Sequence, residues 1–107
     1  MNDLSAQQFL QIVLEADPGT RTIVGGEISY LRTRLKNNSI PIRPHLSSIE
    51  FYAVAKQYPH NIQVTETRIE INNGAELYQK LNNQLMYSQD KKVNKAVLKI
   101  WKGRKGY

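Results

Sequence analysis

The spacing of apolar residues changes twice along this chain of 107 residues, and these changes constrain the fold more than any other feature. Between Pro59 and Gly74, isoleucine and valine alternate with polar residues, which is typical of β-strands. On both sides of this segment, apolar residues recur every three or four positions, as on one face of an α-helix. Residues 65–68 separate the two alternating runs and can serve as a hairpin loop. The pattern therefore predicts a mainly α-helical chain, of the α+β class, with one β-hairpin over about 62–71.

Helix boundaries are indicated by capping residues and by chain breakers. Ser5 and Gln8 have the spacing of a capping box at a helix start, and Ser47 and Glu50 repeat it. Pro59 ends the helix that begins near Ser47, because proline cannot continue a helix. Helices are expected at residues 5–16, 27–36, 47–57, 75–89 and 91–102.

The segments between these helices carry turn signals. Residues 22–24 form a candidate short strand, and the glycine pair at 25–26 should break whatever precedes it. Two prolines keep residues 39–45 extended or looped. The segment 72–74, Asn-Asn-Gly, is expected to close the hairpin as a turn.

The core is expected to collect the apolar faces of these helices. In the fourth helix, Leu77, Leu81 and Leu85 recur at every fourth position. The expected buried face of the third helix comprises Ile49, Phe51, Tyr52, Val54 and Ala55. That of the last helix comprises Val93, Ala96, Val97, Ile100 and Trp101. No linker is long enough to divide the chain, so residues 1–107 are expected to form a single domain.

Three stretches of apolar residues follow one another in a recognisable order. They are Phe9-Leu10-Gln11-Ile12-Val13-Leu14 before Asp17-Pro18-Gly19, then Leu31 to Leu35, then Leu46-Ser47-Ser48-Ile49-Glu50-Phe51 leading to Ile62 and Ile69-Glu70-Ile71. This layout resembles the LOTUS (OST-HTH) domains, a winged helix-turn-helix family linked to RNA. The resemblance implies a winged-helix-like body over residues 5–72, with a three-helix core and one β-hairpin. It leaves residues 75–102 as a C-terminal helical extension, and 103–107 are expected to fray.

The charge of the chain is concentrated near its C-terminus. Residues 91–107 carry seven basic residues and no acidic one, whereas residues 1–90 carry eight basic and nine acidic residues. The net charge of +6 is therefore the sum of +7 in residues 91–107 and −1 in residues 1–90. Such a distribution attracts a polyanion, most often nucleic acid. The candidate nucleic-acid-binding residues here are Lys91, Lys92, Lys95, Lys99, Lys102, Arg104 and Lys105.

A smaller group of basic residues lies in the body. Arg32 and Arg34 in the second helix, and Arg68 at the hairpin, are candidates for further contacts with a nucleic-acid backbone. The third helix reads base edges in many winged-helix proteins, but here it is poor in basic residues, so that role is not favoured. Trp101 lies among cations, where an aromatic ring can stack on an unpaired base. Its place on the apolar face favours a core position instead.

Several classes of function are not expected. The chain has no cysteine, which excludes disulfides and thiolate chemistry. Its two histidines, His45 and His60, have no second ligand at metal-binding spacing, so neither metal nor cofactor is expected. No pair of carboxylates and no phosphate-binding glycine loop has the spacing of an active site, so we expect a protein that is not an enzyme. Without a long apolar stretch or a secretory signal, the expected location is cytoplasmic and soluble.

Three functions remain open from the sequence. The first is a small protein that grips the backbone of RNA or DNA with a basic C-terminal helix. The second is a protein-interaction module or inhibitor whose basic tail docks on an acidic partner. The third, less favoured, is attachment to a membrane surface by the amphipathic last helix. The choice between RNA and DNA, the sequence specificity and the oligomeric state stay open.

Overall fold

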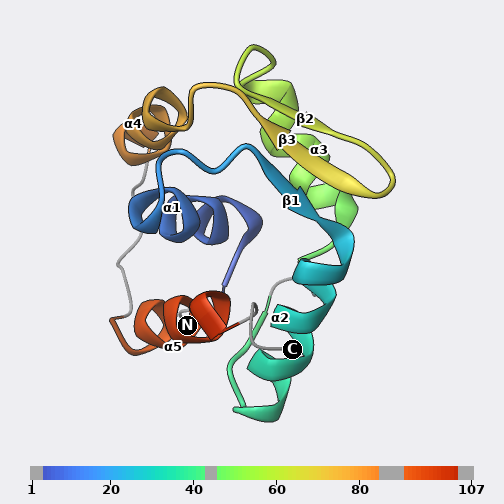
Figure 1. Cartoon of the computed structure of the whole chain (residues 1–107), viewed down its shortest axis with the longest axis vertical. Coiled ribbons are helices and arrows are strands. Elements are labelled where there is room, and N and C mark those ends of the chain that lie inside the picture. Colours follow the sequence, from blue (N-terminus) through green and yellow to red (C-terminus); the bar gives the residue numbers. More distant parts are fainter. Residues whose placement is uncertain (1–3, 43–45, 85–90, 104–107) are drawn as a thin grey trace.

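The computed structural model in Figure 1 describes residues 4–42, 46–84 and 91–103. The elements in these ranges are α1 (Ala6–Ala16), β1 (Thr22–Val24), α2 (Gly25–Asn37), α3 (Ser48–Gln57), β2 (Ile62–Val64), β3 (Arg68–Ile71), α4 (Gly74–Gln84) and α5 (Lys91–Gly103). The described part of the chain is thus mainly helical with one small sheet, which confirms the predicted α+β class.

The strands form one antiparallel sheet with the order β1-β3-β2. Strands β2 and β3 pair as a hairpin in which Ile62 faces Ile71, which confirms the hairpin predicted from the alternating residues. Strand β1 pairs with the other edge of β3 and places Ile23 opposite Ile69. A segment of three residues is too short to display a period, so its pairing with β3 decides that it is a strand.

Helix α1 is the centre of the helical part of the molecule. It lies between α4 and α5 in Figure 1 and also contacts α3. Its start is capped as predicted, because the Ser5 hydroxyl accepts the backbone N–H of Gln8 at 3.2 Å. The ring of Phe9, fully buried, makes T-shaped contacts with Phe51 at 5.9 Å and with Trp101 at 5.4 Å between ring centroids. These contacts join the first, third and last helices around one core.

The glycine pair ends β1 as predicted, but it also opens α2, which therefore begins two residues earlier than predicted. The backbone N–H of Gly25 donates to the carbonyl oxygen of Thr67 at 2.7 Å, which ties the helix start to the hairpin loop. A Cβ atom at position 25 would lie 3.2 Å from that oxygen, so glycine suits this close approach. The local pattern could not reveal this boundary, since a residue 42 positions away determines it.

Helix α3 buries a narrower face than predicted. Phe51 and Val54 are buried, but Ile49 is 80% exposed and Tyr52 is 41% exposed. The assignment of Ile49 and Tyr52 to the core was therefore wrong. The helix packs on α1 and β2 with one side, and the side that carries these two residues faces outward.

The start of α3 also differs from the predicted capping box. The side chain of Ser47 accepts no capping hydrogen bond. The carboxylate of Glu50 accepts the backbone N–H of Ala6 at 2.9 Å. A residue expected to cap its own helix thus connects α3 to the first turn of α1.

Helix α4 begins where the sequence suggested only a turn. Asn73 has a positive φ of 55°, and its side-chain oxygen accepts the backbone N–H of Glu76 at 3.3 Å, which caps the helix. Gly74 is the first helical residue and lies against the carbonyl of Pro18 in the loop after α1. Leu77 and Leu81 are buried as predicted. The rest of the predicted helix, with Leu85, lies outside the described residues.

Candidate functional site

Helix α5 has two opposite faces, as its sequence predicted. Four residues of the apolar face are buried, where α5 packs on α1 and α2: Val93, Val97, Ile100 and Trp101. Four exposed lysines form the opposite side, called here the lysine face: Lys92, Lys95, Lys99 and Lys102. At 3.6 residues per turn, the four lysines fall within an arc of about 80°, centred opposite the buried residues.

The lysine face is a compact source of positive charge. It extends about 15 Å along the helix from Lys92 to Lys102, since an α-helix rises 1.5 Å per residue. The sequence of α5 contains no acidic residue. No ion pair joins Lys95, Lys99 or Lys102 to a carboxylate of the described residues. The positive field of this face is therefore not cancelled within the helix.

Three other basic residues that the sequence predicts to bind nucleic acid have side chains outside the described part of the structure. Lys91 is the first residue of α5, but its side chain lies outside the described part of the structure. Arg104 and Lys105 lie beyond residue 103, outside the described ranges.

Two other side chains of α5 that could contact a base point into the protein instead. Trp101 is only 4% exposed and stacks edge to face with Phe9, which confirms its core position. Asn94 accepts a hydrogen bond from the side chain of Gln8 in α1 at 2.9 Å. The lysine face therefore presents ammonium groups, without an aromatic or amide group among them in the described part of α5.

Buried amides of α1 orient both C-terminal helices. Gln8 and Gln11 are each only 5% exposed, and buried amides need hydrogen-bond partners. Gln8 donates to Asn94 in α5, and Gln11 donates to Asn82 in α4. A rotation of α5 about its axis would break the first of these bonds, so this contact helps to keep the lysine face outward.

The structure brings Arg32 and Arg68 to one cavity, although 36 residues separate them. The cavity, of about 220 Å³, lies between α2, α3 and the β2–β3 hairpin. The Arg32 guanidinium donates to the Ser29 hydroxyl at 3.1 Å, and the Arg68 guanidinium lies 3.7 Å from the Glu70 carboxylate. The Arg68–Glu70 pair is solvent-exposed, and such pairs contribute little stability, so it can exchange for another anion.

Arg34, the third basic candidate of the body, has a different setting. It is exposed on α2, and its guanidinium lies 5.9 Å from the centre of the Tyr30 ring, a cation–π contact. Arg34 is not among the residues that line the cavity shared by Arg32 and Arg68. The three arginines therefore do not form one site in the described structure.

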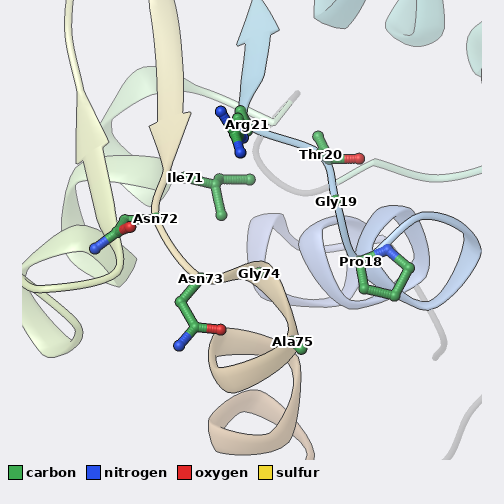
Figure 2. A pocket seen from close by; sticks show the side chains of 9 residues that line it. All are labelled: Pro18, Gly19, Thr20, Arg21, Ile71, Asn72, Asn73, Gly74 and Ala75. Carbon is green, nitrogen blue, oxygen red and sulfur yellow. The ribbon is translucent and has the colours of Figure 1, made fainter.

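A second cavity contains a basic residue that the sequence did not single out. Figure 2 shows this space of about 460 Å³, where residues 18–21 pass the turn from β3 into α4. Arg21 is the one charged residue in its lining and is exposed. Its neighbours in the cavity include Thr20 and Asn73, but no carboxylate or histidine. The lining therefore offers no acid–base pair for catalysis.

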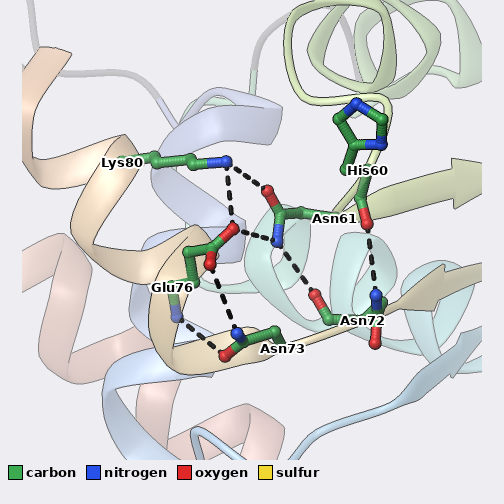
Figure 3. A network of polar contacts seen from close by, with 6 residues as sticks. All are labelled: His60, Asn61, Asn72, Asn73, Glu76 and Lys80. Carbon is green, nitrogen blue, oxygen red and sulfur yellow. Dashed lines mark hydrogen bonds and ion pairs between the residues drawn. The ribbon is translucent and has the colours of Figure 1, made fainter.

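A third polar cluster has a structural role. Asn61 is 2% exposed, and its side-chain nitrogen donates to the carbonyl of Asn72 and to the carboxylate of Glu76, both at 3.1 Å (Figure 3). Its side-chain oxygen accepts the Lys80 ammonium at 2.8 Å, and Lys80 pairs with Glu76 at 3.1 Å. The contacts with Lys80 and Asn61 lower the pKa of Glu76. Asn61 and Asn72 adjoin the hairpin strands, whereas Glu76 and Lys80 lie on α4, so these bonds connect the hairpin to α4.

Comparison with protein-family models, with curated proteins and with solved structures found no match for this chain. Within the described residues, no three histidine or carboxylate side chains gather as metal ligands would. In the same residues, no helix combines the length and the apolar character needed to cross a bilayer. The lysine face remains the candidate site, because it presents four exposed cations on one side of α5.

Proposed function

We propose that this protein is a non-enzymatic nucleic-acid-binding protein that grips the phosphate backbone with the lysine face of α5. One observation carries the proposal: α5 buries its apolar face on α1 and α2 and exposes four lysines on the other side. Lysines that neutralise phosphates release the counterions condensed on a nucleic acid, and this release drives binding without sequence preference.

The order of elements in the body supports a winged-helix interpretation. Helices α1, α2 and α3 precede the β2–β3 hairpin, and β1 completes a three-stranded sheet. The resemblance of residues 5–72 to LOTUS domains adds RNA to the ligands worth testing. The outward side of α3 carries Ile49 and Tyr52 and only one cation, Lys56. We therefore place the main contact on α5 and not on α3.

A salt titration tests the proposal. Four to six phosphate contacts correspond to a slope of log K against log salt concentration of roughly −4 to −5 on a duplex and roughly −3 to −4 on a single strand. Replacing the four lysines of the lysine face by glutamine should flatten this slope and weaken binding to all sequences alike. The fold should survive because the lysines are exposed. The measurement is fluorescence anisotropy with a labelled duplex at several salt concentrations.

A charge-preserving variant provides the control. The same four lysines replaced by arginine should retain the slope and bind at least as tightly, because each position keeps its positive charge. Circular dichroism of both variants checks the fold. Binding by the glutamine variant that equals that of the wild type would refute the proposal.

A protein partner is the second candidate, and the exposed side of α3 favours it. Ile49 and Tyr52 lie three positions apart, so they are neighbours on the helix surface. An acidic peptide that binds as tightly as an oligonucleotide of equal charge would favour this candidate. Attachment to a membrane receives no such support, because the apolar side of α5 is already packed on α1 and α2.

A further inference from the structure

We infer that the lysine face recognises double-stranded nucleic acid as a charged rod, without selecting base, sequence or sugar. This inference rests on the proposed function and narrows its ligand to one class. Three features of α5 support it: the exposed side chains are lysines, Trp101 and Asn94 point inward, and the exposed charges extend along the helix.

The exposed groups of the lysine face are suited to phosphates more than to bases. An ammonium group is a compact point charge that only donates hydrogen bonds, so lysine can reach the acceptors of guanine but cannot make the paired donor and acceptor contacts by which asparagine and glutamine read adenine. Asn94 could make such a pair, but its side-chain oxygen already accepts the Gln8 amide of α1. Four lysines without a partner that accepts hydrogen bonds can therefore select little more than guanine, and we expect phosphate contacts to dominate.

Proteins that bind single strands usually stack successive bases on exposed aromatic rings. The one tryptophan of the chain, Trp101, is committed to the Phe9 ring in the core and is 4% exposed. The described part of α5 has no other aromatic residue. Single strands would therefore bind by their charge alone, and they would also lose conformational freedom when held along a helix.

The shape of the face matches a rigid rod of charge. Its lysines extend over about 15 Å, and a duplex carries one phosphate per 1.7 Å of its axis, so about nine phosphates lie along this span. The apolar contacts of Val97 and Trp101 and the Gln8–Asn94 hydrogen bond hold α5 on the body. The helix that carries the cations is thus already held in place and the duplex is stiff, so binding orders only the lysine side chains.

The same chemistry predicts indifference to the sugar. A protein distinguishes RNA from DNA through the ribose 2′-hydroxyl, which both donates and accepts hydrogen bonds. The lysine face offers donors that are drawn to the phosphates and offers no side-chain acceptor. Duplex DNA and duplex RNA of equal length should therefore bind alike, within about threefold.

The preference for a duplex over a single strand can be given a magnitude. The salt slope is about −0.9 per phosphate contact on duplex DNA and about −0.7 on a single strand, so four contacts give slopes that differ by roughly 0.8. If the two affinities converge near 1 M salt, the duplex binds roughly sixfold more tightly at 0.1 M.

The experiment compares four labelled probes with equal numbers of phosphates, by anisotropy at about 0.1 M salt and with the full-length protein. The probes are duplex DNA, duplex RNA, single-stranded DNA and a single strand that lacks its bases. We expect the two duplexes to bind alike and roughly sixfold more tightly than the single strand. The strand without bases should bind as well as the ordinary single strand, because no base is contacted.

The outcomes separate this inference from the proposed function. Tighter binding to the single strand than to the duplex, or a tenfold loss on removing its bases, would refute the inference and leave nucleic-acid binding intact. A strong preference for one duplex sugar would refute it as well. Binding to none of the four probes would overturn both proposals.

Two further arms make the comparison specific to the lysine face. Replacing its four lysines by glutamine should lower affinity for both duplexes and remove the difference between duplex and single strand. Replacing Lys56 alone by glutamine should change the affinity less than twofold, since Lys56 is exposed on α3 and does not lie on α5. Poly-glutamate that displaces the duplex at equal charge would overturn the inference and point to an acidic protein partner.

Discussion

At the scale of single residues, Tyr58 illustrates a cost that the fold carries. It follows α3 and is 6% exposed, and its hydroxyl is buried without a hydrogen-bond partner among the described residues. Burial raises the pKa of this hydroxyl, although the nearby charge of Lys80 acts in the opposite direction. A buried polar group without a partner costs about 1–3 kcal/mol, so Tyr58 lowers the stability of the native state while its ring fills the core.

Replacing Tyr58 by phenylalanine should therefore raise the free energy of unfolding by about 1 kcal/mol, because the ring stays and the unpaired hydroxyl is removed. Urea unfolding followed by circular dichroism measures this change. Tyr52→Phe is the matched control: its side chain is exposed, so stability should change by less than about 0.5 kcal/mol. A loss of stability in Tyr58→Phe would show that the hydroxyl has a partner in solution.

At the scale of the elements, two helices begin with glycines whose surroundings differ. Gly74 opens α4, and a Cβ atom there would lie 2.4 Å from the carbonyl oxygen of Pro18 and 2.9 Å from the Leu14 side chain. Gly26 is in the first turn of α2, and a Cβ atom there would meet nothing within 4 Å. The first glycine is required by packing between helices, whereas the second is not.

Gly74→Ala should destabilise the protein by about 1–3 kcal/mol, because the backbone at Pro18 cannot move away as a flexible side chain could. Gly26→Ala should be neutral or stabilising by up to about 1 kcal/mol, since alanine is the better helix former. Thermal unfolding of both variants provides the comparison. Equal effects of the two substitutions would show that α4 is not seated on the loop after α1 as described.

At the scale of the whole molecule, the C-terminal helices share the core of the body. Leu77 and Leu81 of α4 and Val97 and Trp101 of α5 belong to the same buried cluster as Phe9 of α1. A helix that contributes its apolar face to a common core has no separate interior of its own, so we expect it to unfold together with the rest.

The one tryptophan of the chain makes this expectation measurable, because Trp101 lies in α5. Its fluorescence and the far-ultraviolet circular dichroism of all helices should report the same urea midpoint. Phe9→Ala should lower both midpoints together, at a cost of about 3–5 kcal/mol. Ile49→Ala is the control, because this side chain is exposed, and it should shift neither urea midpoint. A fluorescence transition at a lower urea concentration than the dichroism transition would show that α5 detaches before the body unfolds.

Local patterns in the sequence determined the β2–β3 hairpin, the existence of the helices and the faces of α5. The alternation around Ile62 and Ile69 predicts the hairpin because side chains of a strand point alternately to its two faces. The spacing of Val93, Val97 and Trp101 predicts the buried face of α5 because residues three and four apart share one side of a helix. The lysine face follows from the same periodicity, so the main candidate site could be predicted from residues within one helix.

Only the tertiary structure decided features that depend on residues distant in the sequence. Ile49 and Tyr52 have the apolar spacing of a buried face but lie outward, because α3 meets its neighbours with a narrower side. Gly25 opens α2 because the Thr67 carbonyl lies beside it, and Asn94 turns inward because its side-chain oxygen accepts a hydrogen bond from Gln8. Periodicity records only neighbours along the chain, whereas these positions depend on groups that folding brings together.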